Sequence, residues 1–235
     1  MKLSRIILVL ALTLGMVTQI YAAQNKPFEL AADVIEYDSA SGIMTGQGSV
    51  KLTQANAIMT GSNVQYNTKT KEAHVTGGVK LVQDNAVMTA EELLSYDNNH
   101  IIATGGVELV QGQNTLTGPQ LDYYADKAYA VINQSARLTM PDGSMTADKI
   151  EAYLNDNQVT GTGHVHLISE TRRLDATSDQ AIYYGAKGET GKVILSGNAR
   201  AVQEGNVLTG NKLTLYLEDK AVNALGRTQL VIQPQ

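Results

Sequence analysis

The chain contains no cysteine and no tryptophan, and Phe28 is its only phenylalanine. Without cysteine there is neither a disulfide framework nor thiolate chemistry. Basic residues are too few for a nucleic-acid-binding face, because 18 Lys and Arg stand against 23 Asp and Glu, a formal net charge of −5. Nearly all of the aromatic content comes from 11 tyrosines. These absences exclude disulfide-stapled, thiol-dependent and nucleic-acid-binding proteins.

A single long apolar run is present, Ile6 to Val17, and two positive residues precede it. A helix over this run would be about 18 Å long, which is short of the ~30 Å apolar layer of a bilayer. We therefore expect residues 1–22 to be a secretory signal peptide that is cut after Ala22, with an uncleaved anchor as the alternative. The mature chain, 23–235, would then be periplasmic and carry a formal charge of −7.

The rest of the chain repeats one pattern about every 29 residues. One element reads Gly-x-Val-x-Leu, as from Gly77 to Leu81, and the other reads φ-x-Tyr with φ apolar, as from Leu94 to Tyr96. Copies of the first element, some degenerate, begin at Gly48, Gly77, Gly105, Gln134, Gly163, Gly197 and Gly226. A fixed period of this length is typical of a stack in which each unit contacts its neighbours.

Both elements place apolar residues at every second position, which predicts strands with one buried and one solvated face. Short polar segments such as Gln83 to Asn85 separate the elements and suit tight turns. The Gly-rich segment 185–191 predicts one longer hairpin loop. No linker or change of composition interrupts the repeats, so the sequence predicts a single all-β domain from 23 to 235.

The apolar residues of both elements are predicted to share the inner face of this sheet. The candidates on that face are Phe28, Leu30, Ile35, Tyr37, Val64, Tyr66, Leu81, Leu94, Tyr96, Leu109, Tyr123, Leu167, Ile182 and Tyr184. If the sheet closes tightly they form a dry core, and if it is splayed they line an apolar trough. A trough would bind acyl chains without any fixed polar group, because each buried CH₂ contributes about 0.8 kcal/mol.

Residues suited to catalysis or metal binding do not cluster in the sequence. His164 and His166 lie two apart on a predicted strand, but no third ligand lies near them. Acidic residues occur at positions that are merely polar in other repeats: Asp33, Glu36, Glu91, Asp122, Asp148, Glu151 and Asp179. A solvated face explains them better than a pair of catalytic carboxylates. We expect no enzyme activity, no metal and no cofactor.

The run Val193 to Ala199, with Gln203, Leu208-Thr209-Gly210, Lys212, Thr214 and Tyr216 after it, resembles the OstA-like family. Ala32 to Tyr37 and Ala147 to Ile150 fit the same family. Within it, the chain is most similar to the periplasmic bridge proteins of lipopolysaccharide transport.

The resemblance implies a repetitive, twisted, partly open β-jellyroll of stacked antiparallel strands. Its apolar interior would hold the acyl chains of lipopolysaccharide on the way from the inner to the outer membrane. The implied partners are lipopolysaccharide, other jellyroll proteins at both membranes, and further copies in head-to-tail contact. The residues alone leave two alternatives open, a structural or adhesive β-solenoid and a β-solenoid enzyme acting on polysaccharide.

The two ends of the stack are predicted to be strand edges that can pair with another chain. The first strand offers Phe28 and Leu30. The last offers Leu230, Val231 and Ile232, an uncharged and partly β-branched segment. We expect both edges to take part in linear assembly.

Overall fold

The computed structural model describes residues 28–96, 99–185, 191–216 and 221–233. The predicted signal peptide and its cleavage site lie outside the described residues, as does most of the Gly-rich segment 185–191. All regular structure in the described part is β-strand, which confirms the predicted all-β class. Within it there is also no helix long and apolar enough to cross a membrane.

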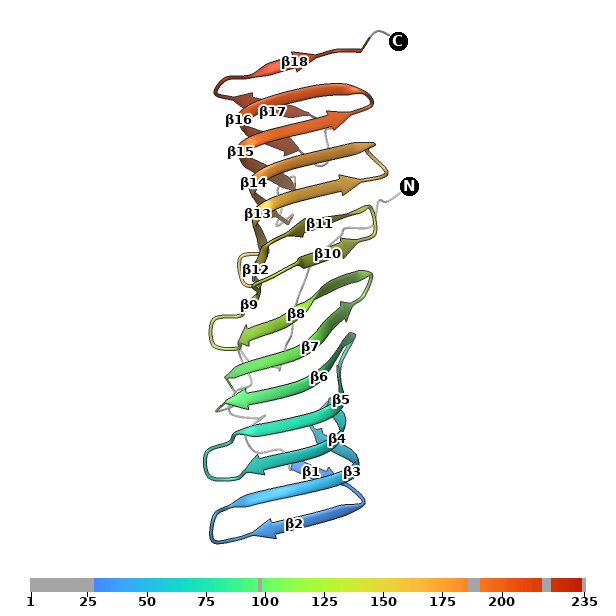
Figure 1. The fold of residues 1–235 in the computed structure, drawn as a ribbon, viewed down its shortest axis with the longest axis vertical. Coiled ribbons are helices and arrows are strands. Elements are labelled where there is room, and N and C mark those ends of the chain that lie inside the picture. Colours follow the sequence, from blue (N-terminus) through green and yellow to red (C-terminus); the bar gives the residue numbers. More distant parts are fainter. Residues whose placement is uncertain (1–27, 97–98, 186–190, 217–220, 234–235) are drawn as a thin grey trace. The chain divides into compact units, whose positions relative to one another are not determined.

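Eighteen strands follow one another in the described part of the chain, and every pairing given within a unit is antiparallel (Figure 1). In chain order they are β1 (Phe28–Ala31), β2 (Val34–Asp38), β3 (Ile43–Gln54), β4 (Ala57–Asn67), β5 (Ala73–Gln83), β6 (Ala86–Tyr96), β7 (His100–Gln111), β8 (Asn114–Tyr124), β9 (Tyr129–Ile132), β10 (Ala136–Met140), β11 (Gly143–Ala147), β12 (Lys149–Tyr153), β13 (Gln158–Ser169), β14 (Leu174–Tyr184), β15 (Lys192–Gln203), β16 (Asn206–Tyr216), β17 (Val222–Leu225) and β18 (Gln229–Val231).

The long strands bend in the middle, at the glycine that opens each Gly-x-Val-x-Leu element. In β5 both Gly77 and Gly78 have positive φ, 83° and 77°. The pairing with β4 shifts its register at this point, between Thr60 and Asn63. A Cβ on Gly77 would lie 2.5 Å from the Cβ of Ser62, so the corner needs a residue without a side chain. The repeated glycine of the sequence therefore marks a corner in the sheet.

Because every long strand bends, its two halves belong to two walls that face each other. In the N-terminal part, wall A consists of β2 and of the strand halves 43–47, 63–67, 73–76, 92–96, 100–104 and 120–124. Wall B consists of β1 and of the other halves of the same strands, 50–54, 57–61, 79–83, 86–90, 107–111 and 114–118. Hairpin turns of two residues close wall B, and longer loops close wall A. This doubled sheet is the repetitive β-jellyroll that was predicted.

The chain divides into two compact units, here called the N-terminal unit (described residues 28–130) and the C-terminal unit (131–233). The boundary falls inside β9. The C-terminal unit repeats the two walls. Its wall A consists of β12, β17 and the strand halves 158–162, 180–184, 192–196 and 212–216. Its wall B consists of β10, β11, β18 and the strand halves 165–169, 174–178, 199–203 and 206–210. The extent predicted for a single domain, 23–235, stays a prediction.

Candidate functional site

The inner face of wall B in the N-terminal unit carries an unbroken apolar row. Residues directly opposite one another in paired strands place their side chains on the same face. The row is Leu30, Leu52, Met59, Leu81, Met88, Leu109 and Leu116. Leu52, Leu81, Met88, Leu109 and Leu116 are buried. Alternation at period two therefore builds a continuous apolar surface across seven strands.

Wall A supplies the opposite inner surface of the same unit. One row across it is Ile35, Gly46, Val64, Val75, Leu93, Ala103 and Leu121. The two walls touch, because a Cβ on Gly61 of wall B would lie 2.7 Å from Cγ1 of Val75 in wall A. At the β1 end, the rings of Phe28 and Tyr66 stack across the interior with centroids 4.9 Å apart. The inner faces thus form one apolar interior between the walls.

This interior is filled in the middle of the unit and open at the β2 end. Leu93 and Leu109 in the middle are only 1% and 2% exposed. At the end, Ile35 and Tyr37 are 46% and 58% exposed although they lie on the same inner face. Large apolar groups that remain exposed in this way commonly mark a surface that something else covers.

The C-terminal unit has the same inner face. Its wall A carries Ala152, Val159, Tyr183, Val193, Leu215 and Val222 in one row. Its wall B carries Leu138, Met145, Leu167, Ala176, Ala201, Leu208 and Leu230. The walls meet here too, because a Cβ on Gly161 would lie 3.2 Å from the Met145 sulfur.

Most of the residues predicted for the inner face lie on it. They are Phe28, Leu30, Ile35, Tyr37, Val64, Tyr66, Leu81, Leu109, Tyr123 and Leu167. Burial raises the pKa of Tyr123 to about 12 and also raises the pKa of Tyr66. Both phenols are therefore neutral at any physiological pH. That these residues contact lipid stays a prediction.

The prediction of the face is wrong for Leu94, Tyr96, Ile182 and Tyr184. Leu94 pairs with His74 and Ile102, while its neighbour Leu93 pairs with the buried Val75 and Ala103. In β14, likewise, the inner positions are Ala181 and Tyr183. A shift of one residue moves a side chain to the other face of a sheet.

A signal for the correct register was present in the sequence. The inner residue of wall A stands four positions after a threonine that precedes the corner, as Val64 follows Thr60 and Leu93 follows Thr89. Counting from the corner threonine gives the right face, whereas aligning the repeats on tyrosine does not. Tyrosine misleads because both faces carry it, as adjacent Tyr123 and Tyr124 show.

The outward tyrosines pack against other polar side chains on the outer face of wall A. Tyr96 stacks on His100, and His100 stacks on Tyr124 with centroids 4.2 Å apart. In the C-terminal unit, the Lys192 Nζ lies 5.4 Å from the centre of the Tyr184 ring. Such aromatic and cation–π pairs stabilise neighbouring strands by about 0.5–1.5 kcal/mol each. They explain these tyrosines without an apolar ligand.

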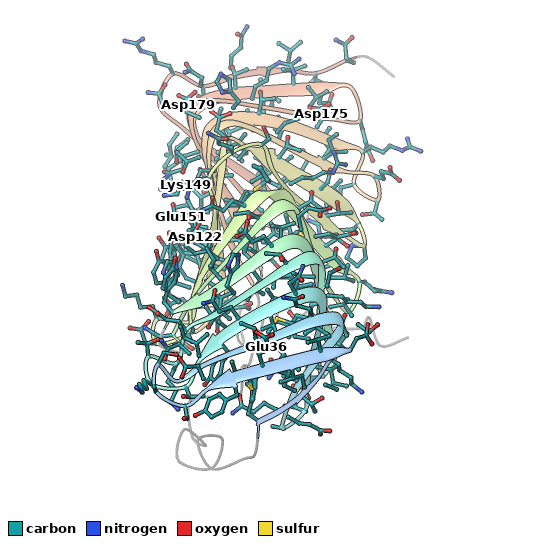
Figure 2. All side chains as sticks on the ribbon, turned by 60° about the horizontal axis from the view of Figure 1, so that its bottom comes forward. Glu36, Asp122, Lys149, Glu151, Asp175 and Asp179 are labelled. Atoms are coloured by element: carbon teal, nitrogen blue, oxygen red, sulfur yellow. The ribbon has the colours of Figure 1, made fainter. Side chains whose placement is uncertain are left out.

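Acidic residues and histidines form no common centre. Glu36 and Asp122 lie on separate strands of the N-terminal unit, and Lys149 pairs with Glu151 at 2.9 Å in the C-terminal unit (Figure 2). Among the described residues there is no group of three or more His, Cys, Asp or Glu placed to hold a metal ion.

The two histidines singled out in the sequence point to different carboxylates. His164 contacts Asp148 at 2.8 Å, and His166 contacts Asp175 at 3.0 Å. The Asp148 hydrogen bond and charge raise the pKa of His164. Each histidine therefore has its own carboxylate partner on the exposed side of the sheet.

The strands predicted to be edges are the first and last of their walls. β1, with Phe28 and Leu30, pairs along β3, and β18 pairs along β16. Leu230 and Val231 are exposed, as is Ile232 just beyond β18. Their role in assembly stays a prediction.

Comparison with known proteins gives two family matches. A model described as "LptA/(LptD N-terminal domain) LPS transport protein" matches residues 91–221, and one described as "OstA-like protein" matches residues 16–148. No curated protein matches the chain. A solved structure of LptH from Pseudomonas aeruginosa, described as the LptA-homologous periplasmic component of a lipopolysaccharide transport device, is similar with 15% identity, 90% of this chain and 99% of that chain covered, and a TM-score of 0.20. Each family model spans more than half of the chain.

Proposed function

The chain belongs to the family of OstA-like, LptA-type lipopolysaccharide transport proteins, and we propose that it is a periplasmic carrier or bridge that holds lipopolysaccharide by its acyl chains. The acyl chains would lie between the two walls, on the inner rows described above. The families that match are transport families, which agrees with a protein that binds and passes on its cargo without chemistry.

One observation carries this proposal: an unbroken apolar row crosses the inner face, and apolar residues of that face are exposed at one end of the N-terminal unit. Ile35 and Tyr37 are 46% and 58% exposed there. An acyl chain that enters at this end and separates the walls would replace contacts between side chains with contacts to lipid. About ten buried CH₂ groups would contribute ~8 kcal/mol of transfer free energy. This gain offsets the loss of contacts between the walls.

Transport between membranes also requires contact with further jellyrolls. We propose that β1 and β2 of the N-terminal unit, and β17 and β18 of the C-terminal unit, pair with other copies or with jellyrolls of the membrane-bound parts of the pathway. An unpaired edge strand offers a row of N–H and C=O groups to an added strand. Such head-to-tail contacts do not close, so assembly is linear and depends on concentration. A cleaved signal at 1–22 would deliver the chain to the periplasm, where these partners are.

The absence of tryptophan from the sequence makes a direct binding test possible. Ile35→Trp places a single indole on the exposed end of the inner face, and Glu36→Trp places one on the outer face beside it. Titration with lipopolysaccharide at low protein concentration should shift the Ile35→Trp emission to the blue and saturate, because the indole leaves water. The Glu36→Trp emission should not change.

An equal response from both positions, or from neither, would contradict the proposal. A second titration uses a detergent of the same chain length in monomeric form, without lipopolysaccharide. It controls for non-specific binding of alkyl chains to the protein surface. Light scattering on the same samples separates lipid binding from self-association, which would cover the same end.

A further inference from the structure

One copy of the repeat has no glycine at the corner of the sheet. In the C-terminal unit this copy begins with Gln134. In the other copies the position is a glycine with φ between 72° and 85°, whereas Gln134 does not have positive φ. These glycines are Gly48, Gly77, Gly105, Gly163, Gly197 and Gly226. The backbone therefore takes a different path through the corner at Gln134.

The strands are also interrupted at this corner. The long strands β3 to β8 and β13 to β16 run through their corners without a break. Residues 133–135 instead separate β9 from β10, and Asp148 separates β11 from β12. A glycine corner has no room for a side chain, since an added Cβ on Gly163 would collide with Asp148. A corner that contains glutamine must be wider than this.

A hollow of about 370 Å³ lies at the interrupted corner, and we call it the corner site. Its lining residues are Asn133, Gln134, Ser135, Asp148 and Lys149. All five have polar or charged side chains, and all except Lys149 are exposed. A ligand can therefore reach the corner site from solvent.

The two charged residues of the corner site already have partners. The Asp148 carboxylate contacts Nδ1 of His164 at 2.8 Å, and the Lys149 Nζ lies 2.9 Å from Oε1 of Glu151 (Figure 2). An anion would meet the carboxylates of Asp148 and Glu151, and a cation would meet the Lys149 ammonium. The corner site therefore favours a ligand without charge.

The remaining three residues offer hydrogen bonds that no other residue uses. Asn133, Gln134 and Ser135 have no hydrogen-bond partner for their side chains within the described ranges of the chain. Two carboxamides and one hydroxyl thus stand side by side, opposite a carboxylate and an ammonium. A carboxamide and a hydroxyl both donate and accept, a carboxylate only accepts, and an ammonium only donates.

We propose that the corner site binds a neutral sugar residue of a glycan. The adjacent hydroxyls of a sugar ring each donate and accept, so they can bridge the carboxamides, the Asp148 carboxylate and the Lys149 ammonium. An apolar ligand would separate these groups from water and leave them without partners, which is costly. The lining therefore suits a ligand that carries many hydroxyls.

This inference goes beyond the proposed function, because the corner site needs no acyl chain. The sugar belongs either to the head group of a carried glycolipid or to a free glycan, and the chemistry that recognises it is the same. Neutral glycosides without lipid are therefore the probes.

The test is saturation-transfer NMR on the mature chain with the methyl glycosides of glucose, galactose and mannose, and with methyl glucuronide as an anionic analogue. Gln134→Gly restores the glycine of the repeat, and Asn133→Ala removes one carboxamide. Gln47→Ala is the matched control, because Gln47 is an exposed glutamine beside the Gly48 corner of the N-terminal unit. Thermal unfolding establishes that each variant is folded.

We expect at least one neutral glycoside to bind the parent protein with a Kd on the order of 1 mM, because its hydrogen bonds largely replace bonds to water. The affinity should fall about fivefold in Gln134→Gly and in Asn133→Ala and stay unchanged in Gln47→Ala. Methyl glucuronide should bind more weakly than the neutral glycosides. No binding of a neutral glycoside, equal affinity in the parent and both corner variants, or tighter binding of the glucuronide overturns the proposal.

Competition then identifies the source of the sugar. Displacement of the probe by the lipid-free core oligosaccharide of lipopolysaccharide assigns the corner site to the head of the cargo, and displacement by maltohexaose assigns it to a free glycan. Displacement by neither overturns the proposal, because the corner site must admit a sugar that is joined to others. The Ile35→Trp titration with lipopolysaccharide tests the proposed function separately, so either proposal can fail without the other.

Discussion

Leu93 and Leu94 are adjacent, chemically identical and on opposite faces of β6, so truncating each one tests the register of the fold directly. Leu93 pairs with Val75 and Ala103 in the apolar interior and is 1% exposed. Leu94 pairs with His74 and Ile102 on the outer face and is partly exposed. The two substitutions to alanine remove the same atoms from two different environments.

The expected losses differ by several-fold. Truncating a fully buried leucine costs about 2–5 kcal/mol, from lost transfer free energy and from the cavity that remains. Leu94→Ala leaves no enclosed cavity and should cost about 1 kcal/mol or less. For a chain of this size, a loss of ~3 kcal/mol lowers Tm by about 6–12 °C.

Urea titration followed by far-ultraviolet circular dichroism, with thermal melts as a second measure, gives both values on the mature chain. Leu93→Ala should unfold at clearly lower urea, and Leu94→Ala close to the parent. Equal losses, or a larger loss for Leu94→Ala, would refute the assignment of Leu93 to the interior and with it the inner rows.

Three further predictions concern the corners of the sheet, the buried Tyr123 and the edge strands. Gly77→Ala should lower the free energy of unfolding by more than Gly78→Ala does, and chemical denaturation measures the difference. Both glycines have positive φ, but only at Gly77 would the new Cβ clash, because it would lie 2.5 Å from the Cβ of Ser62. Tyr123 has its pKa raised to about 12 by burial, so the folded chain holds this proton where the unfolded chain releases it. Stability should therefore fall as pH rises from 10 towards 12, and denaturation at several alkaline pH values should show less of this fall in Tyr123→Phe. Val231→Pro removes an N–H from β18, so light scattering should show shorter linear assemblies while the melting temperature hardly changes. If the parent and the Val231→Pro protein are both strictly monomeric, edge pairing is contradicted.

The sequence predicts the architecture well because its strongest signals are local. Alternation at period two fixes strands, and the repeated glycine fixes the corner, where Gly77 and Gly78 need positive φ. The period of about 29 residues corresponds to one pair of bent strands. Strands and corners can therefore be predicted from neighbouring residues alone, without knowing which distant residues are in contact.

The faces of individual strands are harder to predict, because the corner adds residues and changes which positions point inward. Tyr123 lies inward and Tyr124 outward, so a tyrosine in the repeat does not by itself mark a face. The buried glutamines of wall B in the N-terminal unit escaped prediction for another reason. Gln83 and Gln111 precede turns, where polar residues are ordinary, and only the pairing of strands shows that they share an inner row with Ala86.

The central claim, that the inner face of the bent sheet holds lipid, is tested most directly by photo-crosslinking at adjacent positions in cells making lipopolysaccharide. The photoreactive residue is placed at Tyr66 and Tyr183 on the inner face, and at their neighbours Gln65 and Tyr184 on the outer face. The account predicts lipopolysaccharide adducts from Tyr66 and Tyr183 and none above background from Gln65 and Tyr184. Adducts of equal yield from both members of each pair, or from the outer members alone, would contradict it.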